Sequence, residues 1–182
     1  MINKNMIAAL NKQITEEIYS AYLYLSMSSY CSYIGLKGAS VWFFVQTQEE
    51  MTHAYRLQHY IARLGEEVVL GAIKKPPTEF KSLTHMYEEA LKHEKFITAC
   101  ISDLVNLAVA EKDRSTEAFL QWFVNEQVEE EENDMDVLAK LRLAGKDGSA
   151  LLMIDNELAT RTFVLAPDLT LPGQAGAAAA GA

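Results

Sequence analysis

Apolar residues recur every three or four positions through four long blocks of this 182-residue chain, and helix-breaking residues fall between the blocks. The blocks cover about 3–34, 39–64, 82–112 and 116–144, and a short amphipathic piece follows over about 150–160. The connection over 66–81 carries Gly71 and the Pro76-Pro77 pair, and it is too long for a tight antiparallel turn. The pattern therefore predicts an all-α four-helix bundle in which this crossover leaves the second and third helices parallel, plus a short fifth helix.

Composition limits the possible functions. With 49% hydrophobic residues, the chain suits one domain over 1–162 followed by a low-complexity tail over 163–182. The formal net charge of −9 argues against nucleic acid or an anionic membrane as a partner and favours attraction of cations. We see no signal peptide and no membrane-spanning run, so we expect a cytoplasmic protein. The two cysteines lack CxxC spacing, which disfavours a disulfide framework or a zinc site.

Four acidic or amide side chains lie on the apolar faces of four different predicted helices: Glu17, Glu50, Glu94 and Gln127. Burying a carboxylate costs several kcal/mol or more unless a base, a proton or a metal compensates. Glu17 and Glu50 are 33 residues apart, as are Glu94 and Gln127, so the two helical hairpins carry their polar groups in matching register. This register predicts one polar site in the middle of the bundle.

A second ligand-type residue follows one turn later in two of the helices, His53 after Glu50 and Glu130 after Gln127. Oxygen-rich ligands with a single imidazole suit iron, whereas zinc would more often be given sulfur or more histidine. A bundle that carries a Glu on two helices and Glu-x-x-His on the others is typical of di-iron carboxylate proteins, and the fourth helix departs from that pattern. The spacing therefore predicts a di-iron centre.

The motifs as a set resemble those of the bacterial non-haem ferritins. The resemblance rests on Glu17 with Tyr24, on Glu94, and on the segments 48–54 (QEEMTHA) and 119–131 (FLQWFVNEQVEEE), and it extends over about 1–162. It implies a ferritin-like fold, a hollow shell of twenty-four subunits, and oxidation of Fe(II) by O2 before ferric mineral is stored. No nucleic acid or membrane partner is implied.

The resemblance also implies the roles of individual residues. The di-iron centre would be built from Glu17, Glu50, His53, Glu94, Gln127 and Glu130. Glu50 would bridge the two irons, and Gln127 would ligate the second iron or orient a water. A third iron site near the inner surface would use Glu49, Glu126, Glu129 and Glu130. Because Gln127 is neutral, the second site should hold iron less tightly and let it pass to the cavity.

Several alternatives remain open at this stage. Tyr24 is either an electron donor to an oxygen intermediate or a buried aromatic with a hydrogen bond. Met51 stands in a Glu-Met-x-His segment that also occurs in haem-containing bacterioferritins, but Gln127-x-x-Glu130 in the fourth helix disfavours haem and a di-iron oxidase. Asp134 falls one turn beyond Glu130, where an apolar residue is expected, as an extension of the acidic patch.

The first helix carries a signal for oligomerisation. From Tyr19 to Tyr33 it is apolar or aromatic nearly all round, and four of its residues face away from the Glu17 stripe: Tyr22, Leu23, Tyr30 and Tyr33. A helix that is apolar on both sides is buried on both sides. In a one-domain chain the outer face then requires another copy, so we expect a homo-oligomer.

Overall fold

The computed structural model describes residues 2–166 and 169, and within them it contains five helices and no strands. The helices are α1 (Lys4–Tyr33), α2 (Lys37–Arg63), α3 (Leu83–Ala110), α4 (Arg114–Ala144) and α5 (Gly148–Leu158). The all-α prediction is confirmed, and every helix end lies within two residues of its predicted position.

The start of α4 corrects one expectation. From the sequence, Ser115 and Thr116 are plausible capping residues at the start of the fourth block, but the N-cap is Asp113. Its Oδ1 accepts the backbone N–H of Thr116 at 3.1 Å, and its Oδ2 accepts the Thr116 hydroxyl at 2.6 Å. A carboxylate cap adds a favourable interaction with the helix dipole, so Asp113 is the better cap.

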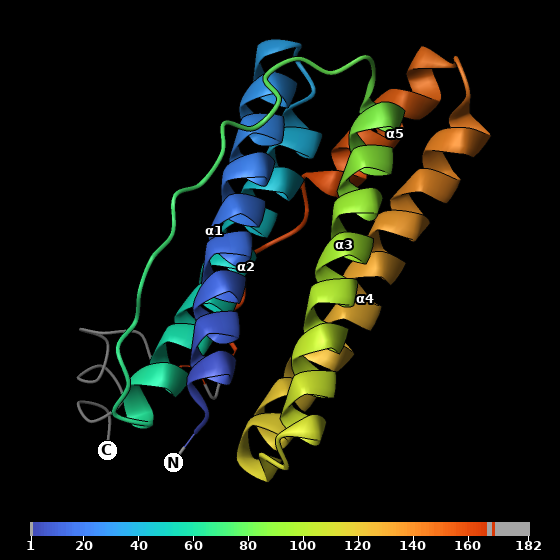
Figure 1. Cartoon of the computed structure of the whole chain (residues 1–182). Coiled ribbons are helices and arrows are strands. Elements are labelled where there is room, and N and C mark those ends of the chain that lie inside the picture. Colours follow the sequence, from blue (N-terminus) through green and yellow to red (C-terminus); the bar gives the residue numbers. More distant parts are fainter. Residues whose placement is uncertain (1, 167–168, 170–182) are drawn as a thin grey trace, which may run out of the picture.

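Two antiparallel hairpins form the bundle, α1 with α2 and α3 with α4 (Figure 1). The connection from α2 to α3 runs the length of the bundle along α1, so α2 and α3 point the same way, as predicted (Figure 1). Side chains of α1 hold this crossover by hydrogen bonds. Asn11 Oδ1 accepts the N–H of Val69 at 2.9 Å, and the hydroxyl of Tyr30 donates to the Phe80 carbonyl at 2.8 Å.

The apolar core has two halves. One half gathers around Tyr24, Phe43 and Tyr87, and the other around Leu57 and Phe123. On every long helix the two sets leave a gap of several residues, and the buried acids fall in that gap. The bundle therefore carries a polar layer between two apolar layers, which fixes the height of the candidate site.

Helix α5 crosses the end of the bundle and packs against α2 and α4. Close backbone contact with α2 depends on Gly38, where an added Cβ would come within 1.6 Å of the Asp155 carbonyl oxygen. The Asp155 carboxylate also accepts the backbone N–H of Ala39 at 2.8 Å, one of the orphan donors at the start of α2. These contacts fix the residues that follow α5.

No helix in the described part of the chain is long and apolar enough to cross a membrane. The cytoplasmic location and the division at residue 162 stay predictions. Most of the predicted tail over 163–182 lies outside the described residues.

Candidate metal centre

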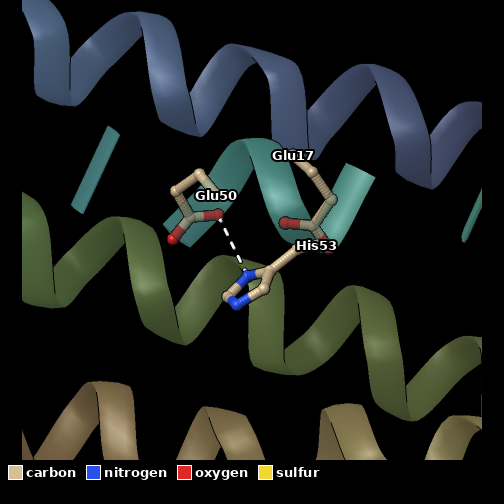
Figure 2. A group of neighbouring side chains, drawn as sticks. All are labelled: Glu17, Glu50 and His53. Atoms are coloured by element: carbon tan, nitrogen blue, oxygen red, sulfur yellow. Dashed lines mark ion pairs between the residues drawn. The ribbon is translucent and has the colours of Figure 1, made fainter. Parts of the chain in front are cut away.

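The first group of candidate ligands joins α1 to α2. Glu17 comes from α1, while Glu50 and His53 come from successive turns of α2 and point toward it (Figure 2). One ligand atom from each lies within 4.8 Å of the other two, and all three side chains are buried. Glu50 Oε2 is 3.5 Å from His53 Nδ1. The structure thus brings together the three residues expected to bind the first iron.

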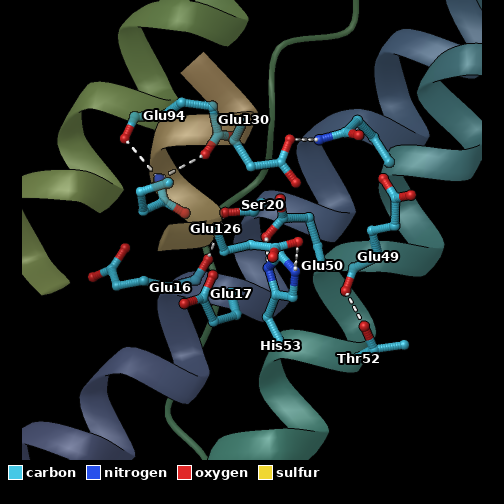
Figure 3. A network of polar contacts seen from close by, with 12 residues as sticks. Glu16, Glu17, Ser20, Glu49, Glu50, Thr52, His53, Glu94, Glu126 and Glu130 are labelled. Atoms are coloured by element: carbon cyan, nitrogen blue, oxygen red, sulfur yellow. Dashed lines mark hydrogen bonds and ion pairs between the residues drawn. The ribbon is translucent and has the colours of Figure 1, made fainter. Parts of the chain in front are cut away.

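A second group shares the imidazole and reaches α4. His53, Glu126 and Glu130 also offer ligand atoms within 4.8 Å of one another, with His53 Nε2 3.6 Å from Glu126 Oε1 (Figure 3). Glu130 is buried and is held by Gln46 of α2, whose amide donates to Glu130 Oε2 at 2.6 Å. His53 therefore lies between carboxylates contributed by both hairpins.

Glu94 of α3 is held from both sides. The hydroxyl of Tyr24 donates to Glu94 Oε1, and the amide of Gln127 donates to Glu94 Oε2 at 3.2 Å. Gln127 also donates to the backbone carbonyl of Glu94 at 3.2 Å, so this amide links α4 to α3. In this arrangement Gln127 presents an N–H to a neighbouring carboxylate and adds no negative charge.

The third predicted set is not gathered in the same way. Glu129 is exposed, and the carboxylate of Glu49 accepts a hydrogen bond from Arg161 at 2.5 Å. Among the described residues, Glu126 and Glu130 join a metal-competent group only with His53. A third iron site at these four carboxylates stays a prediction.

Electrostatics in the buried layer favour protons when no cation is present. Burial raises the pKa of Glu94 to about 7 and that of Glu130 to about 8, and it also raises the pKa values of Glu17 and Glu50. Burial alone would lower the pKa of His53, but the charge of the Glu50 carboxylate, and the hydrogen bonds that the imidazole donates to Glu126 and Glu50, raise it well above its usual value. A cation entering this layer would displace protons and relieve the repulsion between carboxylates.

The donor set fits a metal that prefers oxygen. Glu17 Oε2 is buried and has no hydrogen-bond partner among the described residues, which is the arrangement expected of a ligand atom awaiting a cation. Carboxylates with one imidazole match iron better than zinc or copper. The buried group of Glu17, Glu50 and His53 is therefore chemically suited to bind an iron cation.

Sequence reasoning missed three side chains that orient the ligands. Gln13 donates to Glu17 Oε1 at 3.0 Å, and Gln46 holds Glu130 as described. Thr98 accepts from Gln127 at 3.3 Å and donates to Glu131 at 2.7 Å. A sequence signal was available for the two glutamines. Each lies four residues before a predicted ligand, and hence on the same buried helix face.

Asp134 is more deeply buried than the sequence indicated. Its side chain is 1% exposed, and neither carboxylate oxygen has a hydrogen-bond partner in the described part of the chain. Burial, and then the charges of Glu94 and Glu130, raise its pKa to about 9. Asp134 thus extends the buried acidic layer by one turn of α4 beyond Glu130, and its raised pKa favours the protonated form.

Comparison with known protein families gives one consistent result. The family profile described as "Ferritin-like domain" matches residues 7–144. Bacterial non-heme ferritins of Shigella flexneri and Campylobacter jejuni are each 41% identical to the chain. These alignments cover 88% and 85% of this chain and 97% and 93% of the relatives, respectively.

Solved structures agree with the sequence comparison. An open-pore ferritin from the archaeon Archaeoglobus fulgidus superposes with a TM-score of 0.88 at 49% identity, over 89% of this chain and all of that one. A closed form of the same ferritin, engineered by mutagenesis, gives 0.89 at 49% identity over 90% of this chain and 100% of that one. The expected ferritin-like bundle is confirmed.

Proposed function

Because the chain belongs to the ferritin family, we propose that it stores iron by oxidising Fe(II) with O2 inside the bundle and depositing ferric mineral within a shell of its own copies. The observation that carries the proposal is the buried group of Glu17, Glu50 and His53, with Glu17 Oε2 lacking a partner among the described residues. Iron is here a substrate, so the site must bind it and also release it.

The ligands divide between two ferrous ions. Glu17 and His53 bind the first ion, Glu94 and Glu130 bind the second, and Glu50 bridges them. Each Fe(II) gives one electron to O2, and the protein supplies position and negative charge. Gln46 and Gln13 keep carboxylates aimed at the ions through the hydrogen bonds described above. Tyr24, bonded to Glu94, fixes that ligand and is the candidate electron donor of the site.

Release follows from Gln127. A glutamate there would add a charge to the second site, whereas the amide gives a neutral donor to Glu94. The second ferric ion is therefore held by fewer charges than in a permanent di-iron cofactor. This supports turnover of iron through the site, and it weighs against a di-iron oxidase.

The shell is supported by apolar side chains on the outer faces of α1 and α2. Tyr22 and Leu25 on α1, and Val41 and Phe44 on α2, are all at least 39% exposed. Leu23, which we expected on this outer face, is instead buried in the core, and Tyr30 is half-buried and donates to the Phe80 carbonyl of the crossover. The remaining apolar face still requires a partner, and a second copy of the chain is the proposed one. The proposed particle has twenty-four copies, and the non-heme names of the relatives support a shell without haem.

The test is to add Fe(II) aerobically to the purified protein and follow ferric absorbance, with size-exclusion chromatography to measure the particle. Glu17→Gln and His53→Ala should slow oxidation at least about tenfold, because each removes a ligand of the first ion. Glu132→Gln changes an exposed carboxylate on α4 and serves as the control. Oxidation at the wild-type rate by either ligand variant would refute the assigned site.

A further inference from the structure

Arg161 reaches the edge of the metal centre from outside the four-helix bundle. It follows the last turn of α5, where its N–H donates to the Leu158 carbonyl at 3.3 Å. Its Nη2 donates to Glu49 Oε2 at 2.5 Å, and its guanidinium carbon lies 4.3 Å from the centre of the Trp42 ring. Both partners of the ion pair are only about one-fifth exposed. The pair is thus a defined, partly buried contact between the C-terminal segment and α2.

Glu49 stands where negative charge accumulates. The nearby carboxylates of Glu126 and Glu129 raise its pKa beyond the effect of burial, while Arg161 and His53 lower it. These carboxylates, with Glu130, are the set proposed for a third iron. The guanidinium of Arg161 already places a positive charge against one member of these carboxylates, Glu49.

We propose that Arg161 occupies the place of the third cation, so that Glu49 becomes a metal ligand only when the guanidinium moves away. The inference rests on the proposed function, because it concerns iron binding at the same centre. The third site is then a conditional site, weak while the residues after α5 are docked, whereas the first ion, at Glu17 and His53, shares no terminal ligand with it.

Competition follows from charge and hydrogen bonding. A divalent ion on Glu49 would lie within a few ångströms of the guanidinium, where like charges repel strongly in a partly buried setting. Release of Arg161 is eased because its Nη1 is buried without a hydrogen-bond partner in the described residues. Stacking on Trp42 gives the side chain a second contact that does not involve Glu49.

The experiment is a calorimetric titration of the assembled, metal-free protein with Zn²⁺, which binds without redox chemistry. Arg161→Gln should tighten the third binding event by about tenfold, the scale of one charge-assisted hydrogen bond, and leave the first event unchanged. Arg161→Lys keeps the charge and should bind the third ion as weakly as the wild type. Arg142→Gln, an exposed arginine on α4 paired with Glu88, is the matched control.

Tryptophan fluorescence provides a second readout. Trp42 contacts Arg161, whereas Trp122 lies edge-on to His53 with ring centres 5.4 Å apart. The fluorescence of Trp42 is identified as the part of the emission that is lost in a Trp42→Phe variant. This fluorescence should change during the third event in the wild type and stay constant in Arg161→Gln. The Trp122 emission should follow the first two events in both.

The outcomes separate the two proposals. Absence of the first two events in the wild type would refute the proposed function. The role of Arg161 is refuted if the first two events are present but the third event is absent from both proteins. It is also refuted if the third event is equally strong in the wild type and in Arg161→Gln. Weakening of all three events in Arg161→Gln alone would mean that Arg161 only supports the fold, which also overturns the inference.

Discussion

Asp134 offers a sharp test of the electrostatics of the buried layer. Its carboxyl is 1% exposed and both oxygens lack hydrogen-bond partners among the described residues, so the folded protein holds it protonated, with a pKa of about 9 against an ordinary value of 3.8. A raised pKa in the folded state means that the folded protein binds more protons than the unfolded chain between those values. The contribution to stability is therefore fully present below about pH 3.8 and is lost as the pH rises toward 9.

The magnitude follows from linkage. Each pH unit above the ordinary value costs about 1.4 kcal/mol, which gives about 4 kcal/mol at pH 7. Asp134→Asn removes the ionisation while keeping the shape of the side chain. In the metal-free protein its advantage over the wild type should be near 2 kcal/mol at pH 5 and about 6 kcal/mol at pH 8. For a chain of this length the change between the two pH values corresponds to about 10 °C in melting temperature.

The assay is calorimetric melting of chelator-treated protein at pH 5 and pH 8. Asp136→Asn is the control, because Asp136 is exposed on the same helix. Glu94 and Glu130 also titrate over this range and interact with Asp134, so the difference between Asp134→Asn and the wild type reports Asp134 together with its effect on those two groups. An Asp134→Asn advantage that is equal at the two pH values, or absent at both, would show that the carboxyl is solvated or paired and that the reasoning fails.

Two further predictions concern the other unusual contacts. Gln127→Glu places a carboxylate about 3 Å from Glu94 Oε2 in place of a donor, so the metal-free protein should lose about 1 to 3 kcal/mol of stability. Titration with Zn²⁺ should show a tighter second binding event in this variant. An unchanged second event would mean that Gln127 has no role in iron release. Gly38→Ala forces a Cβ into the Asp155 carbonyl oxygen and should cost at least about 2 kcal/mol, measured as a lower melting temperature, whereas Gly148→Ala, where a Cβ meets open space, should be nearly neutral.

The fold was readable from the sequence because each long helix carries an apolar stripe that is interrupted at only one level, and three of the four long helices end at a glycine. Gly35, Gly65 and Gly145 adopt positive φ, which L-residues with a Cβ rarely do, so they mark helix ends on steric grounds. The sequence did not reveal Asp113 as the cap of α4, because Asp, Ser and Thr are all common N-cap residues. Only the positions of the backbone N–H groups decide among them.

The candidate site was partly readable for a different reason. Acids on an apolar stripe are expensive, so Glu17, Glu50 and Glu94 were conspicuous from the sequence alone. Amides are cheaper to bury, and Gln13 and Gln46 therefore looked unremarkable until their hydrogen bonds were seen. Arg161 was not predictable, because its contact with Glu49 joins residues 112 positions apart through a helix that crosses the bundle end. Only the docking of α5, which depends on Gly38, brings them together.

The metal-free centre should be the least stable part of a stable bundle. Glu94, Glu130 and Asp134 all have pKa values raised to about 7 or above, and each keeps a proton at a cost that well-packed apolar residues would avoid. A cation that binds the folded state alone recovers about 2.7 kcal/mol at a concentration one hundred times its dissociation constant. The two apolar layers above and below must therefore supply enough stability to keep the empty site folded between iron ions. A site that passes its substrate on spends much of its time empty, so separating the polar layer from two complete apolar layers is the arrangement such a site requires.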